Sequence, residues 1–129
     1  MVVMIKSITL SIIILTFASC ATTLKSNKYG DSGLYALTSD KMIEIAQIAM
    51  KEEFEENQLS RLTEPQLGFK ARWEYLLDYL DISIYVVEHG EKGYSFEIKT
   101  DGTALVTGNI KAQNIMRKAK ALADSSVSK

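Results

Sequence analysis

The sequence is poor in the residues on which most protein chemistry depends, because its 129 residues include one cysteine, one histidine and one proline. A single cysteine excludes an internal disulfide and a cysteine cluster for zinc. The histidine, His89, precedes a glycine in an expected turn, so we interpret it as a solvated turn residue. The metalloprotease, serine-hydrolase and glycine-rich phosphate-binding patterns are absent. These absences argue against an enzyme and predict no catalytic residue, no metal and no other cofactor.

An excess of charge of one sign is also lacking. The chain has 15 basic and 16 acidic residues, which leave a net charge of -1. Such a balance does not attract phosphates, so we expect no nucleic-acid partner. The composition, 47% hydrophobic and 24% charged, is typical of a globular protein. The length suits a single domain.

The most apolar stretch of the chain lies near its amino terminus. Residues 8–17 are apolar except for three hydroxyl side chains, and they are far fewer than the roughly 20 residues that a membrane-spanning helix needs. Lys6 precedes this stretch, and the small residues Ala18 and Ser19 follow it. This order is typical of a secretory signal peptide, so we interpret residues 1–19 in that way. A permanent transmembrane helix is the weaker alternative.

The end of this segment carries a more specific motif. Phe17-Ala18-Ser19-Cys20 resembles the lipobox of bacterial lipoproteins, with Phe17 in place of the usual leucine. The resemblance implies diacylglycerol on the Cys20 thiol, cleavage between Ser19 and Cys20, and further acylation, for example by palmitate. Ala21 resembles the outer-membrane sorting signal, which implies the inner leaflet of the outer membrane, facing the periplasm. The alternative is a chance cysteine after an ordinary secretory signal.

The remaining chain divides into a tether, one domain and a short tail. Residues 20–33 are polar apart from Cys20 and a few small or apolar residues, and they show no periodicity, so we expect the lipidated cysteine to be followed by a flexible tether. Residues 34–124 form the predicted domain, and residues 125–129 a polar tail. A helix is expected from Ser39 or Asp40 to about residue 57, because apolar residues recur there at helical spacing.

The middle of the domain predicts strands. Residues 66–75 fit a strand slightly better than a helix, and residues 76–81 an irregular or helical turn. Alternating residues around 82–86 and 94–98 predict two strands joined by a loop at 89–93. Asp101-Gly102 predicts a tight hairpin turn, with a further strand over residues 103–107.

A last helix is expected from about residue 109 to residue 123. The predicted fold is therefore α+β, with an N-terminal helix, an antiparallel meander of three to four strands and a C-terminal helix in two layers.

Aromatic residues are the most promising candidates for a binding surface. Trp73, Tyr85 and Tyr94 fall in the predicted sheet, and alternation along a strand places some rings away from the helices. The simpler interpretation is that each ring packs in or near the core. Paired carboxylates at the end of the first helix, Glu52 or Glu53 with Glu56, could support acid–base chemistry, but their polar surroundings favour a solvated helix end.

The sequence thus predicts a membrane-anchored lipoprotein that acts as a non-enzymatic binding or assembly module with an envelope protein partner. Its alternatives are an immunity or inhibitor lipoprotein that neutralises a periplasmic toxin or hydrolase, and a carboxylate-dependent enzyme. The first alternative predicts a concentrated acidic or aromatic patch, and the second a deep pocket with converging polar groups.

Overall fold

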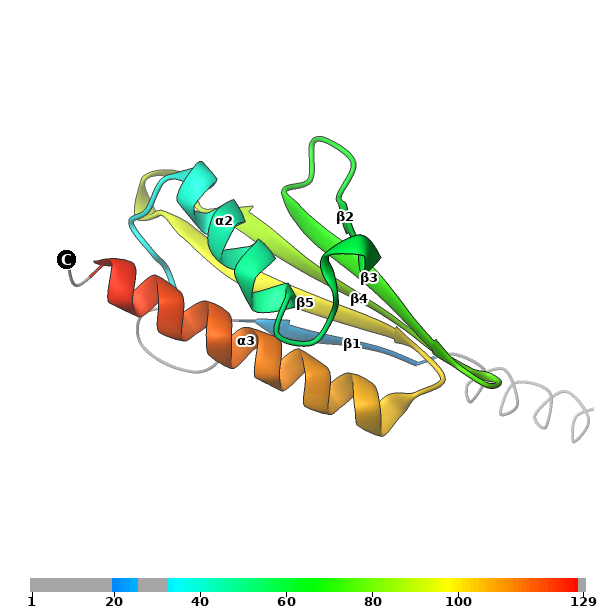
Figure 1. Ribbon diagram of the computed structural model, residues 1–129. Coiled ribbons are helices and arrows are strands. Elements are labelled where there is room, and N and C mark those ends of the chain that lie inside the picture. The colour runs from blue at the N-terminus through cyan, green and yellow to red at the C-terminus, as the bar shows by residue number, and fades with distance from the viewer. Residues whose placement is uncertain (1–19, 26–32, 128–129) are drawn as a thin grey trace, which may run out of the picture.

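The computed structural model in Figure 1 describes residues 20–25 and 33–127 of the chain. The predicted signal peptide, with Ser19, therefore lies outside the described residues, as do residues 26–32 of the expected tether and the last two residues. The elements, in chain order, are β1 (Cys20–Lys25), α2 (Ser39–Met50), η2 (Glu56–Gln58), β2 (Leu59–Arg61), β3 (Gly68–Tyr75), β4 (Asp78–Glu88), η3 (Gly90–Lys92), β5 (Tyr94–Gly102) and α3 (Leu105–Val127).

The fold is α+β: one antiparallel sheet lies against two helices. The sheet has five strands in the order β1-β5-β4-β3-β2, and all neighbours are antiparallel. Helices α2 and α3 cover the same face of the sheet (Figure 1). The described strands number five rather than the expected three to four, because the two edge strands β1 and β2 lie in segments that sequence periodicity did not mark.

The edge strand β1 differs most from expectation. Residues 20–25 were expected in a flexible tether, but they pair with β5 from Cys20 opposite Gly102 to Lys25 opposite Glu97. The pairing satisfies backbone groups along an edge of β5 that would otherwise be open. Leu24 lies opposite Ile98 and packs against the core, which ties this polar strand to the domain. The first helix of the domain is therefore preceded by a strand.

Helix α2 begins as expected and ends earlier. The side chain of Thr38 caps it by accepting a hydrogen bond from the backbone N–H of Lys41 at 3.2 Å. The helix ends at Met50, not near residue 57. The chain then turns so that Phe54, which is 4% exposed, enters the core, with its N–H donating to the Met50 carbonyl. We infer that burying the Phe54 ring stabilises the fold more than continuing the helix through the charged residues 51–56 would.

The strand interpretation of residues 66–75 is confirmed by β3, and the loop at 89–93 joins β4 to β5. The turn expected over residues 76–81 is limited to Leu76 and Leu77, since β4 already begins at Asp78. Along β4, buried residues alternate with more exposed ones, as expected for a sheet with one covered face.

The hairpin predicted at Asp101-Gly102 is wrong. Strand β5 continues through Gly102, and the predicted strand over 103–107 is replaced by the start of α3 at Leu105. Gly102 is required for close packing: its φ is +140°, and a Cβ there would lie 2.3 Å from the Tyr79 carbonyl oxygen. Helix α3 runs to Val127, so residues 125–127 of the expected tail are helical.

The core lies between the sheet and the helices. It combines branched and aromatic residues of β3, β4 and β5 with a largely small-residue stripe on α3. The buried residues of α3 are Gly108, Ala112, Ile115, Met116, Ala119 and Ala123. Small side chains allow the helix to approach closely, and a Cβ on Gly108 would lie 2.7 Å from a methyl group of Leu80.

Candidate binding surface

The face of the sheet opposite the helices is the candidate binding surface in the described part of the chain. We call it the open face. Alternation along the strands places on it Lys70, Arg72 and Glu74 of β3, Tyr79, Asp81, Ser83, Tyr85 and Val87 of β4, and Glu97, Lys99 and Asp101 of β5.

The centre of the open face is an ion pair with fixed geometry. Arg72 donates from Nε to Oδ1 of Asp81 at 2.8 Å and from a terminal nitrogen to Oδ2 at 2.9 Å. This bidentate hydrogen bonding lowers the pKa of Asp81 and raises that of Arg72. Glu74 lies 3.4 Å from the same guanidinium, which also sits 5.0 Å from the centre of the Tyr79 ring. The arginine is therefore held by three neighbours, Asp81, Glu74 and Tyr79.

A second cation–aromatic pair lies farther along the sheet. The ammonium of Lys99 is 5.1 Å from the centre of the Tyr85 ring and 3.7 Å from a carboxylate oxygen of Glu97. Val87 and Tyr85 help to line a shallow hollow of about 360 Å³ beside this pair. Cations over aromatic rings present apolar area and hydrogen-bond donors together, which suits contact with a protein or a glycan.

Beside the arginine pair lies a further hollow of about 480 Å³. Its lining includes Ser60, Lys70 and Ser83 in addition to Arg72 and Asp81. The open face thus consists of aromatic rings, charge pairs and shallow depressions. The binding surface predicted from the sequence did not include the charged residues of this face, although the alternation of charged and apolar residues along β3 marked their positions.

The structure does not bring the three predicted aromatic residues together. Tyr85 lies on the open face, whereas Trp73 and Tyr94 lie on the helix-covered face and pack partly against the core. Trp73 stacks on Tyr75 with 6.0 Å between ring centres, near the turn between β3 and β4. Tyr94 pairs with Tyr35 through backbone hydrogen bonds at the other end of the sheet. For these two rings the packing interpretation describes the structure better.

The carboxylates that follow α2 connect the helices. Glu53 accepts hydrogen bonds from Nδ2 of Asn114 at 2.7 Å and from Nζ of Lys111 at 3.2 Å. Glu52 lies 3.1 Å from the ammonium of Lys118. These contacts hold α2 against α3, so the paired carboxylates have a structural role. In the described segments, no group of three histidine, cysteine, aspartate or glutamate side chains could hold a metal ion.

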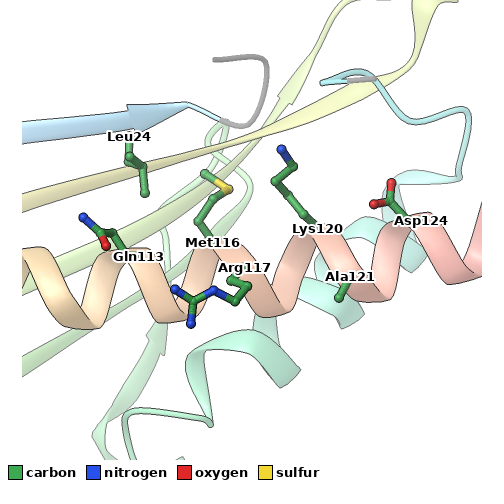
Figure 2. Close-up of a pocket in the computed structure, with 7 residues that line it drawn as sticks. All are labelled: Leu24, Gln113, Met116, Arg117, Lys120, Ala121 and Asp124. Carbon is green, nitrogen blue, oxygen red and sulfur yellow. The ribbon is translucent and has the colours of Figure 1, made fainter. Parts of the chain in front are cut away.

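A pocket of about 520 Å³ lies between β1 and α3. In Figure 2, Leu24 points from β1 toward α3, and Met116 points from α3 toward the sheet. Lys120 and Asp124 line the same space. Burial raises the pKa of nearby Tyr35 to about 12, and the negative charge of Asp124 adds to this increase.

The fold and surface define a class: a small α+β domain with one helix-covered sheet face and one open, charged and aromatic face. No protein-family model, curated protein or solved structure matches the chain. In the described segments, no helix combines the length and apolar character needed to cross a membrane.

Proposed function

We propose that this chain is a bacterial lipoprotein, held by lipid on Cys20 at the inner leaflet of the outer membrane and facing the periplasm. It acts there as a non-enzymatic binding or assembly module for an envelope protein. The partner binds the open face, with Tyr85, Lys99 and the Arg72–Asp81 pair at the contact.

The observation that carries this proposal is the open face itself. On this face the Arg72 and Lys99 cations lie over tyrosine rings, and shallow hollows lie beside them. Such a face offers a partner both apolar area and directed hydrogen bonds. Cations and carboxylates alternate across it, which differs from a concentrated acidic patch. Its aromatic rings would suit an immunity or inhibitor protein as well as an assembly module. The lipobox motif supports the anchor, and Cys20 is the first residue of β1.

The anchor is tested by the variant Cys20→Ser in the native host. We expect the unchanged chain in the membrane fraction, with the mass of a diacylated or triacylated mature protein. We expect the variant to lack this acylated form. The variant Thr23→Ser, on the same strand, serves as the control and should behave like the unchanged chain. An unmodified leader on the unchanged chain would refute lipid attachment.

The partner surface is tested by a photoreactive residue placed at position 85 in the intact envelope. The control position is Glu44, which is exposed on α2 and lies on the opposite side of the domain. We expect a crosslinked product from position 85 and none from position 44. The same product from both positions, or no product from position 85, would contradict a partner on the open face.

A further inference from the structure

Exposed apolar side chains gather at one end of the domain. Among the described residues, eight large hydrophobic side chains are exposed, and six of them lie at the end of β3, in the β3–β4 turn or in the first two turns of α3. The six are Tyr75, Leu76, Leu77, Leu105, Val106 and Ile110. We call this set the apolar end. Such clustering differs from the scattered exposure that is normal on a monomer surface.

The sheet register places Cys20 at the same end. Gly102 pairs with Cys20 on one side and with Leu80 on the other. Leu80 is three residues from the turn at Leu77, and Gly102 is three residues before Leu105. In Figure 1 the start of β1, the β3–β4 turn and the start of α3 lie together, whereas the carboxyl end of α3 lies at the opposite end.

The β3–β4 turn is an unfavourable place for leucines unless they contact something. Leu76 is 88% exposed and Leu77 is 98% exposed, so neither contributes to the core. Leu76 also has a φ of +55°, a conformation in which a side chain is strained and for which glycine or asparagine is preferred. Water-exposed leucines in a strained turn indicate a use outside the fold itself.

We propose that the apolar end is a membrane-contact surface, in which the β3–β4 turn and the first turns of α3 enter the interface of a phospholipid bilayer. This inference rests on the proposed lipid attachment at Cys20. Because Cys20 is itself paired in the sheet, no tether separates the lipid from the domain, and the apolar end lies against the bilayer. Trp73 and Tyr75, which stack on each other beside the turn, are residue types that favour this interface.

The charges near the apolar end indicate that its contact with lipid is apolar rather than electrostatic. Asp78 and Asp101 lie beside it and are exposed. A surface with these carboxylates gains little from anionic headgroups, so the contact depends on burial of apolar side chains and should change little with salt. With this end on the membrane, the strands run away from the bilayer, and the open face is accessible from the side.

The test uses the single cysteine of the chain. Lipid on Cys20 blocks its thiol, so Leu77→Cys provides one site for an environment-sensitive dye. Lys92→Cys is the matched control, because it lies in the β4–β5 loop at the other end of the same sheet and is exposed. The full lipidated variants are purified from membranes, labelled and reconstituted in phosphatidylcholine vesicles.

We expect the dye at position 77 to be quenched by nitroxides on the lipid chains and several-fold less by aqueous iodide than the dye at position 92. Val106→Cys should behave like position 77. If each chain carries one dye, Cys20 is blocked and the anchor stands. Equal iodide quenching at positions 77 and 92 in such chains would overturn the membrane contact alone. Two dyes per chain, measured by mass, would show a free Cys20 and overturn the proposed anchor instead.

Discussion

Replacing Leu76 by glycine should stabilise the domain even though it removes a large hydrophobic side chain. The side chain is 88% exposed, so its removal loses little burial. Its φ of +55° costs a residue with a Cβ about 1–2 kcal/mol, and glycine avoids this cost. Glycine also makes the unfolded chain more flexible, which removes about 0.5–1 kcal/mol of the gain.

The alanine variant at the same position isolates the contribution of the turn. Leu76→Ala loses the same side-chain contacts as Leu76→Gly, but it keeps a Cβ at positive φ. We therefore expect the glycine variant to be more stable than the alanine variant by about 0.5–1 kcal/mol. Any contact of the leucine with detergent or lipid is lost in both variants and cancels in this difference.

Urea unfolding of the purified full chain in a nonionic detergent provides the measurement. Trp73 is the only tryptophan and stacks on Tyr75 beside the turn, so its fluorescence reports the loss of this end of the sheet. A glycine variant that is equal to or less stable than the alanine variant would refute the left-handed turn at Leu76. In that case the conformation of Leu76 would give no support to a membrane contact at the apolar end.

Three further predictions concern the fold and its charges. Gly68→Ala should destabilise the domain by about 3 kcal/mol or more, because a Cβ there would lie 1.9 Å from a carbonyl oxygen of β4. The control is Gly90→Ala, whose Cβ meets open space and which should cost about 1 kcal/mol. Equal losses of stability in thermal unfolding would contradict the packing at Gly68. Glu53→Gln should cost about 1–2 kcal/mol in urea unfolding, since it weakens two half-buried contacts between the helices, and an unchanged midpoint would argue against this role. Because the pKa of Asp81 is lowered, its pair with Arg72 stabilises the fold above pH 3.8, the ordinary carboxyl pKa, and this stabilisation is lost as the pH falls through the folded-state pKa. The variant Asp81→Asn should therefore lose less stability than the unchanged chain when the pH is lowered below 3.8. An acid-unfolding profile that is the same for both proteins would contradict the pair.

Local patterns predicted the parts of the fold in which one face is buried. The alternation of residues 82–86 and 94–98 identified β4 and β5, and the helical spacing after Ser39 identified α2. These elements were predictable because burial on one side imposes a period of two or 3.6 residues on the sequence itself.

Contacts between distant segments decided the remaining parts. Asp101-Gly102 has the local chemistry of a turn, yet β4 approaches so closely that Gly102 serves as a strand residue. The segment that begins at Cys20 has weak strand character by itself, and it becomes β1 because β5 offers an unpaired edge.

The candidate surfaces divide in the same way. The sequence by itself determined the lipobox-like motif at Cys20, the alternation of sheet residues and the lack of familiar catalytic patterns, because each depends on residues that are neighbours in the chain. Only the tertiary structure decided that Tyr85 is separated from Trp73 and Tyr94, that Arg72 meets Asp81, and that the turn leucines share one end of the domain with Cys20. Strand register and helix coverage set these relations, and both arise from contacts between segments far apart in the sequence.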